Sequence, residues 1–335
     1  MALTTDGAGV SLLLGVVLLY LGAESLVTGA KGLATDVGVR AAVAGVTVVA
    51  FATTAPELFV AVVGKLEKTT TIGLGAVVGS NVANICLVLG LSALVRPMAV
   101  SRETVRRHLP FMVAAAVLLV ALGADGTLST LDGAVFLLVL AGFTVVLLRG
   151  VSDPDPDAAD AAAGDGADTG AVVADGGTAV AAPLGRLARV DPRDLLFLGA
   201  GLALLLVGAR RLVEGGTAAL YLLGGSDRLV GVTVLALGTS LPELAASLVS
   251  ALRGEADFSV GNVVGSNIYN VLAVLGVLTL LSPIRVPASV VGTDFPVLLA
   301  ATACCALLLA VRGRVGRVAG AGLLAGYAGY VSLLV

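Results

Sequence analysis

Two glutamates lie in the middle of long apolar stretches, where a charged side chain is costly. Glu57 and Glu243 each follow a proline, and a threonine precedes each glutamate by four residues. A charge at the centre of a bilayer is expensive, so such a residue usually faces a protein-lined cavity and a partner of opposite charge. Because no Lys or Arg lies at a similar depth in these stretches, we expect the partner to be a bound cation.

Neutral oxygen atoms accompany each glutamate. Thr53 and Thr239 precede the glutamates by about one helical turn and therefore share their helix face. The proline before each glutamate removes a backbone donor and displaces the carbonyl four residues earlier, which belongs to Ala52 in one stretch and to Gly238 in the other. A broken helix is tolerated at membrane depth where it lines a cavity, and a cation would satisfy both the freed carbonyl and the carboxylate.

A second apolar stretch follows each glutamate motif and carries serine and asparagine. Ser80 and Asn84 are four residues apart and share a helix face, and Ser266 and Asn270 repeat the spacing. Hydroxyl and amide oxygens suit hard cations such as sodium and calcium. The alternative is helix packing, in which small residues let two helices approach and Ser or Asn hydrogen-bonds between them. We favour ligation for these four residues and packing for the asparagine that directly follows each serine.

All of these residues belong to an internal repeat. Residues 45–90 align with residues 231–276 without a gap, with 21 identities in 46 positions. Every residue is separated from its counterpart by 186 positions, as Glu57 is from Glu243. A gap-free match of this length indicates that the chain consists of two related halves.

The composition indicates that both halves lie in a membrane. Of the 335 residues, 58% are hydrophobic and 13% are charged, whereas a soluble domain has about 45–50% apolar and about 25% charged residues. A membrane-crossing helix needs ~20 mostly apolar residues, and we therefore predict an all-α integral membrane protein with ten transmembrane helices. They lie at roughly 10–30, 41–64, 71–94, 109–123, 129–148, 195–213, 229–252, 259–281, 295–311 and 318–334.

Five spans in each half fix how the halves are related. Because five is odd, the second half enters the membrane from the opposite side, which gives the inverted-topology repeat of secondary transporters with a site near the midplane. We predict a first five-helix repeat at 1–150 and a second at 193–335. The two glutamates would then meet, and since adjacent carboxylates repel, one divalent ion, two monovalent ions or two protons would balance them.

The segment between the halves differs from the rest of the chain. Residues 151–192 contain seven Asp between Asp153 and Asp175, without Lys or Arg in that interval. Such a composition predicts a disordered acidic loop, with calcium sensing as the alternative role. With the N-terminus outside, 14 of the 20 Lys and Arg fall in inside loops, which agrees with the positive-inside rule. We expect a multi-pass protein of the cell membrane with its termini outside and the acidic loop inside.

At these motifs the sequence resembles the cation/calcium antiporter superfamily, and most closely its prokaryotic sodium/calcium exchanger members. The paired repeats of that family carry G-T-S-x-P-E and G-S-N-x-x-N/D. Here residues 52–57 read ATTAPE, 238–243 read GTSLPE, 79–84 read GSNVAN and 265–270 read GSNIYN. The resemblance implies alternating access, in which sodium entry drives calcium extrusion and the two glutamates are the central calcium ligands. It also implies that two backbone carbonyls contribute, which makes the candidate ligands Glu57, Glu243, Thr53, Thr239, Ser80, Ser266, Asn84, Asn270, Ala50 and Ala236.

Two departures from the family pattern affect the expected transport. Asn270 stands where several sodium/calcium exchangers have Asp, so the site has two carboxylates rather than three and a three-to-one sodium ratio does not follow. Ala52 and Thr54 replace Gly and Ser in the first motif. Our leading hypothesis is an antiporter that exchanges Na⁺ for Ca²⁺, and the alternative is a proton- or potassium-coupled antiporter with the same site.

Other classes of protein fit the sequence less well. A channel would conduct without a counter-ion, and inverted halves around an occluded pair of glutamates argue against one. An intramembrane hydrolase would need a nucleophile with a base, a metal-ligand set or paired Asp residues, which the predicted spans lack, so we do not expect an enzyme. The predicted partners are inorganic cations and the lipid bilayer. The net charge of −3 argues against nucleic acid, and no protein partner or cofactor is inferred.

Overall fold

The chain folds into an all-helical membrane protein with ten membrane-crossing helices, several of which consist of two or three consecutive helical segments. The computed structural model describes residues 5–66, 70–152, 190–224 and 238–334. In these residues, eight helices are long and apolar enough to cross a membrane. The predicted span 229–252 lies partly outside the described residues. The last predicted span, 318–334, corresponds to α17. The helices are α1 (Thr5–Val37), α2 (Ala41–Ala44), α3 (Ala50–Leu66), α4 (Thr70–Ala83), α5 (Leu89–Val95), α6 (Leu109–Gly123), α7 (Thr130–Ser152), α10 (Pro192–Leu222), α13 (Leu241–Arg253), α14 (Ala256–Tyr269), α15 (Gly276–Leu281), α16 (Phe295–Arg312) and α17 (Arg317–Leu334).

Several of these helices are joined end to end through π-helical turns. The π-helical segments are η1 (Gly45–Val49), η2 (Asn84–Val88), η3 (Thr104–His108), η5 (Asn270–Leu275) and η6 (Val290–Asp294). The start of η2 at Asn84 matches the start of η5 at Asn270, and η3 matches η6, at the same separation of 186 residues. A π turn is often found at a functional site, and here two of them begin at candidate ligand residues.

Two short antiparallel ladders, which the sequence analysis did not predict, also follow the repeat. Strand β1 (Met98–Ala99) of the first half pairs with β4 (Arg314–Val315) of the second. Strand β3 (Ile284–Arg285) of the second half pairs with β2 (Thr127–Leu128) of the first. Each half therefore contributes one strand to each ladder, as an inverted repeat requires.

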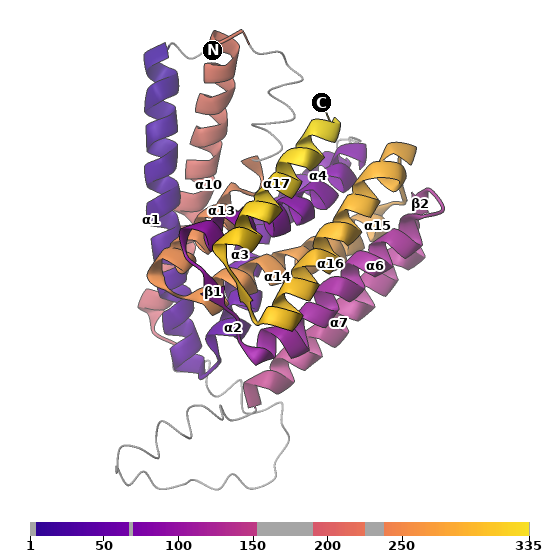
Figure 1. The fold of residues 1–335 in the computed structure, drawn as a ribbon, viewed down its shortest axis with the longest axis horizontal. Helices are drawn as coiled ribbons and strands as arrows, with labels where there is room; N and C mark the ends of the chain where they lie inside the picture. Colours follow the sequence, from indigo (N-terminus) through magenta and orange to yellow (C-terminus); the bar gives the residue numbers. More distant parts are fainter. Residues whose placement is uncertain (1–4, 67–69, 153–189, 225–237, 335) are drawn as a thin grey trace, which may run out of the picture.

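The long helices α1 and α10 stand side by side at the edge of the molecule, apart from the main bundle over part of their length (Figure 1). Glycines spaced seven residues apart line their contact. A Cβ atom added at Gly22 would lie 2.7 Å from the backbone nitrogen of Leu205, and one added at Gly208 would lie 2.7 Å from that of Leu19. Only glycine permits backbones to approach so closely, and small-residue contacts of this kind join helices in membranes.

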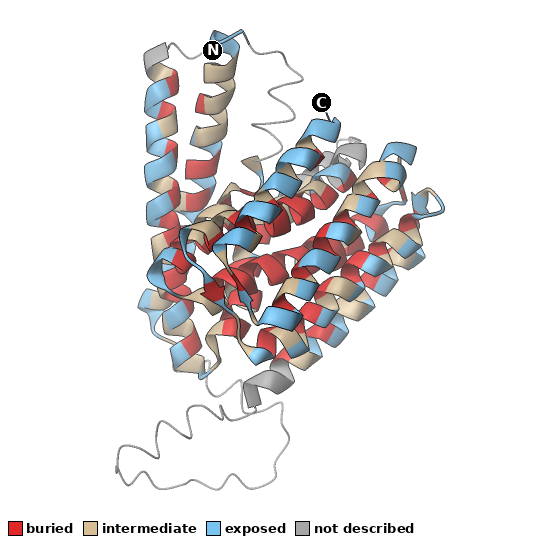
Figure 2. Cartoon of the chain, viewed as in Figure 1, coloured by how far each residue is buried: buried red, intermediate tan, exposed pale blue. Residues whose placement is uncertain are grey.

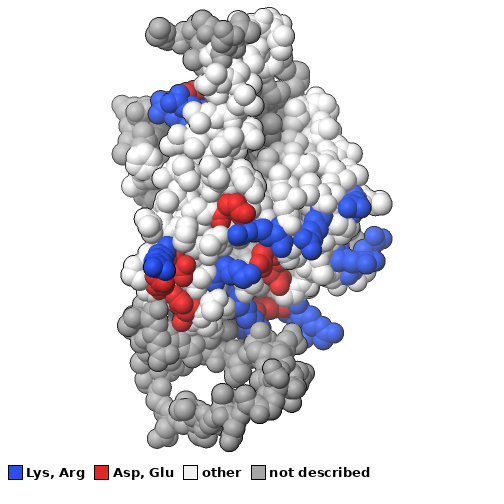
Figure 3. Space-filling model, turned by 90° about the vertical axis from the view of Figure 1, so that its left-hand side faces the viewer, with Lys and Arg blue, Asp and Glu red and all other residues white. Residues whose placement is uncertain are grey.

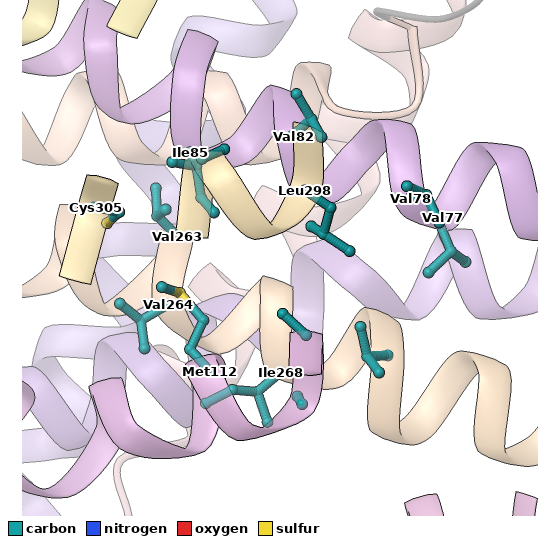
Figure 4. Close-up of a cluster of buried hydrophobic side chains, with 14 of the residues drawn as sticks. Val77, Val78, Val82, Ile85, Met112, Val263, Val264, Ile268, Leu298 and Cys305 are labelled. Atoms are coloured by element: carbon teal, nitrogen blue, oxygen red, sulfur yellow. The ribbon is translucent and has the colours of Figure 1, made fainter. Parts of the chain in front are cut away.

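The remaining helices enclose α14, which lies at the centre of the bundle. Every residue of α14 from Phe258 to Ile268 is buried, and buried residues fill the middle of the molecule while exposed ones face outward (Figure 2). Helix α14 packs against η1, α13 and α3 and also contacts α6 and η2, and its Val263 and Val264 lie near Ile85 and Met112 (Figure 4). This core fixes α14 relative to both halves.

The outer surface fits a protein surrounded by lipid. Leu131 and Leu138 of α7 and Val318 of α17 are among the many large apolar side chains that are exposed. Figure 3 shows Lys, Arg, Asp and Glu gathered mainly in a band across the lower part of the face formed by α1 and α10, with a mostly uncharged surface above. Such a band marks one membrane boundary.

The predicted boundaries need small corrections. Helix α7 continues to Ser152 and α10 begins at Pro192, so helix occupies both edges of the segment predicted as a loop at 151–192. The Asp191 side chain accepts a hydrogen bond from the Arg193 backbone, and this N-cap explains where α10 starts. Residues 153–189, on which the predicted disorder falls, lie outside the described residues.

Candidate cation site

Glu243 lies in the first turn of α13, where the second half places its motif. The helix begins at Leu241 after Ser240, with Pro242 near its first position, as suits a residue that lacks an N–H. The spacing of Ser240 and Glu243 is that of a capping box, yet neither side chain makes a capping hydrogen bond. Glu243 is completely buried, and among the described residues neither of its carboxylate oxygens has a hydrogen-bond partner of ordinary geometry.

Glu57 has different surroundings in the first half. Helix α3 runs without interruption from Ala50 to Leu66 and contains Pro56. A single proline removes one hydrogen bond, which a helix packed on several sides tolerates. Glu57 is only partly buried, and its Oε1 accepts a hydrogen bond from Ser80 Oγ at 3.0 Å.

A pocket of about 270 Å³ leads to Glu57 between α3 and α10. Its polar residues are Glu57, Thr239 and Arg210, and the prolines of both motifs also line it. Thr239 is exposed, and its hydroxyl lies 3.5 Å from Ser80 Oγ. One glutamate of the pair is thus accessible, whereas the other is sealed inside the protein.

At the site, each half places a polar side chain beside the glutamate of the other half. The carboxylates of Glu57 and Glu243 are close enough for their charges to interact. Asn270 of the second half lies beside the Glu57 carboxylate, and Thr53 of the first half lies beside the Glu243 carboxylate. Each glutamate therefore has a polar neighbour from the opposite repeat, and the site exists only where the halves meet.

Several buried polar atoms of the candidate ligands have no hydrogen-bond partner among the described residues. Both amide atoms of Asn84, the hydroxyl of Ser266 and Oδ1 of Asn270 are buried without a hydrogen bond, and Asn270 Nδ2 donates to Asn81 Oδ1 at 3.5 Å. Native proteins rarely bury unsatisfied polar groups. The three oxygen atoms of this set fit a cation as ligand, whereas Asn84 Nδ2 is a donor that a cation would not satisfy. Within the described residues no group of three or more acidic, His or Cys side chains gathers, so the site rests on two carboxylates.

The structure thus brings Glu57, Glu243, Thr53, Thr239, Ser80 and Asn270 together, and it buries Asn84 and Ser266 on the adjoining helices. The carbonyl of Ala50 accepts a hydrogen bond from Thr53 Oγ1 at 3.2 Å. Ala236 lies outside the described residues. Asn81 Oδ1 accepts a hydrogen bond from Asn270, which is itself a candidate ligand. Asn267 donates to the carbonyl of Val263 at 2.7 Å. The packing role of these two asparagines stays a prediction.

One residue of the site escaped the sequence analysis. Asn262 is completely buried and hydrogen-bonds to Thr53 and to the backbone of Glu243. Its position in the first half is occupied by Ala76. A polar residue that appears in only one of two otherwise matching apolar spans was the signal that would have identified it.

Comparison with known proteins agrees with this architecture. The sequence profile of the family described as "Sodium/calcium exchanger protein" matches residues 8–149 and again residues 194–335. Over 332 residues the chain is 35% identical to the putative antiporter CaxA of Alkalimonas amylolytica, covering 98% of each chain. It is 32% identical over 328 residues to the inner membrane protein YrbG of Escherichia coli, covering 96% of this chain and 95% of the relative. A structure of the sodium-calcium exchanger NCX_Mj superposes with a TM-score of 0.77 at 29% identity and covers 99% of this chain and 100% of the other.

The fold and the site define a multi-pass membrane transporter for cations, built from two inverted repeats that share one pair of glutamates. Since the family profile spans most of both halves, the chain belongs to the sodium/calcium exchanger family. It is therefore a cation exchanger and not an enzyme.

Proposed function

We propose that the protein exchanges Na⁺ for Ca²⁺ by alternating access, with Glu57 and Glu243 as the shared calcium ligands. The observation that carries this proposal is the pair of neighbouring carboxylates, one from each repeat, together with the buried oxygens of other candidate ligands that have no hydrogen-bond partner among the described residues. One calcium ion or two sodium ions would cancel both charges, whereas the empty site would keep two repelling carboxylates. This difference favours crossing of the membrane with ions bound.

The surrounding residues would divide the remaining ligation. We assign Thr53 and Thr239 to the calcium position, because each hydroxyl lies next to the paired glutamates or their partners. The other oxygens extend along the two adjoining helices and would supply additional sodium positions. These ligands are Ser80, Ser266, Asn84, Asn270 and the backbone carbonyls of Ala50 and Ala236.

The access state follows from the pocket and from the proposed orientation. With the termini outside and the acidic loop inside, the second half of α10 lies towards the outside. The pocket that reaches Glu57 is lined by Ala209, Arg210 and Val213 of that half. The structure would then represent a state in which calcium or sodium reaches the site from outside.

Flux into reconstituted liposomes tests the proposed coupling. Vesicles loaded with sodium should take up ⁴⁵Ca²⁺ when external sodium is absent, and dissipating a pH gradient with an ionophore should leave this uptake unchanged. Uptake that ignores sodium and requires an imposed proton or potassium gradient would favour the second candidate, a differently coupled antiporter. That candidate uses the same two glutamates, and the name of CaxA states an antiporter without stating its coupling ion.

A further inference from the structure

Asn262 of α14 connects the two halves next to the glutamates. Its Nδ2 donates to the backbone carbonyl of Glu243 at 3.2 Å and to Ser247 Oγ at 2.9 Å. Its Oδ1 lies 3.2 Å from Thr53 Oγ1, which donates to it. The side chain is completely buried, so both donors and the acceptor of the amide are used.

This arrangement fixes which way the amide points. If the amide turned over, its oxygen would face the carbonyl oxygen of Glu243, and its nitrogen would face Thr53. The first contact would place two acceptors against each other without water to relieve them, which is costly in a buried site. Asn262 therefore presents its oxygen, and not its nitrogen, to the Thr53 hydroxyl.

The orientation of that hydroxyl decides whether Thr53 can bind a cation. A hydroxyl carries one proton and two lone pairs, and a cation requires a lone pair directed at it. The Thr53 hydroxyl lies 3.2 Å from both Asn262 Oδ1 and the carbonyl of Ala50, and it also lies beside the Glu243 carboxylate, which is a third acceptor for its proton. When the proton is donated to Asn262, the lone pairs of Thr53 are left for the side where Glu243 lies.

The first half has no equivalent link. Ala76 occupies the position of Asn262, and Ala61 occupies that of Ser247. Thr239 is exposed, and its hydroxyl lies 3.5 Å from that of Ser80. The two threonines, although related by the repeat, are therefore held to different degrees.

We propose that Asn262 is a positioning residue, which turns the Thr53 hydroxyl proton away from the ion and makes Thr53 the better prepared of the two threonine ligands. The proposal rests on the proposed function of the site, and it adds a residue that acts on the ion through Thr53. Asn262→Ala should therefore raise the KM for calcium while the maximal rate per folded molecule is retained.

The test is a double-mutant cycle in the liposome uptake assay. Replacing Asn262 by Ala should raise the calcium KM by roughly threefold to tenfold, the size expected from one buried hydrogen bond. In a Thr53→Val background, the same replacement should change KM by less than about twofold, because the hydroxyl on which Asn262 acts is gone. An equal rise of KM in both backgrounds would overturn the proposal.

Two controls separate positioning from a general structural effect. Asn267→Ala removes a buried asparagine of the same helix whose bond goes to the carbonyl of Val263, and it should leave the calcium KM unchanged. Poorly folded protein lowers the maximal rate but not KM, so the KM readout remains valid in a weakened variant. If the unmodified protein transports calcium and Asn262→Ala has the same KM, this inference alone fails; absence of calcium transport by the unmodified protein would refute the proposed function.

Discussion

The two halves of the protein have the same motifs but different states of closure. In the half that contributes Glu243, the carboxylate is completely buried, and Asn262 connects the backbone carbonyl of Glu243 to the hydroxyl of Thr53. On the side of Glu57 and Thr239, a pocket reaches the glutamate and the threonine is exposed. A symmetric sequence thus produces an asymmetric site, as expected for a transporter that opens to one side at a time.

The two long helices show the same difference. Helix α1 is tied to the end of α13, where Arg253 Nε lies 2.8 Å from Glu24 and Arg253 Nη1 donates to Thr28 at 3.0 Å. An ion pair between Lys31 and Glu255 adds a second connection. In α10, the position of Glu24 is taken by Arg210, which forms an ion pair with Glu214 of its own helix. Ion pairs therefore join α1 to the end of α13, whereas Arg210 of α10 pairs within its own helix.

The largest effect should come from removing either charge of the glutamate pair. Glu243→Gln and Glu57→Gln should each lower sodium-dependent calcium uptake by more than roughly 100-fold, because a divalent ion would remain half neutralised in a buried site. Uptake into liposomes measures the loss. Glu214→Gln, which alters an exposed glutamate of α10, should retain uptake; if Glu243→Gln transports as well as this control, the paired site is wrong.

The next effect concerns the contact between α1 and α10. Gly208→Val would drive a side chain into the backbone of Leu19, and overpacking of this kind costs about 1–3 kcal/mol. We expect a lower melting temperature in detergent together with reduced uptake. Gly199→Ala changes the same helix where a Cβ atom meets nothing within 4 Å, and it should leave both properties unchanged. Equal melting temperatures for the two variants would show that the glycine contact does not join the helices.

The contributions of Thr53 and Thr239 to calcium binding can be compared directly. Thr53→Val should raise the calcium KM by about tenfold, because the Thr53 hydroxyl is held by a buried amide. Thr239→Val should raise it by about threefold or less, because Thr239 has no such amide partner within the described residues. Uptake measured over a range of calcium concentrations gives both values. A larger effect at Thr239 would reverse the proposed asymmetry.

The smallest effect is expected at the ion pairs of α1. Arg253→Gln removes the pair with Glu24, and since exposed pairs contribute at most about 1 kcal/mol, the population of the outward-open state should fall by no more than roughly fivefold. The apparent affinity for external calcium would weaken by the same factor. Arg211→Gln removes a pair within α10 and serves as the matched control. An unchanged affinity in Arg253→Gln would mean that these contacts do not hold the inner side closed.

Much of the fold could be predicted because membrane helices leave strong signals in the sequence. Span 109–123 coincides with α6, and span 295–311 with all but the last residue of α16. The repeat predicted that the halves are inverted, and the strand pairings agree with this. The sequence did not predict the π turns or the two-residue ladders, since neither leaves a periodic pattern of apolar residues.

The site was predicted in its residues but not in its asymmetry. Thr53 and Thr239, like Glu57 and Glu243, are indistinguishable by motif, and both prolines were expected to displace the carbonyl four residues earlier. In the structure α3 continues through Pro56 whereas α13 begins beside Pro242. Such differences arise from packing with the other half, which a local motif does not encode. Asn262 could not be found from the repeat, because the repeat identifies residues shared by both halves and Ala76 occupies this position in the first half.

Equilibrium binding of calcium shows whether one ion is held jointly by a glutamate from each repeat. Purified protein titrated with ⁴⁵Ca²⁺ in the absence of sodium should bind one ion per chain, and Glu57→Gln and Glu243→Gln should each abolish that binding while the variants remain folded. Binding of two ions per chain, with each variant losing only one of them, would show that the glutamates form separate sites and would contradict the account.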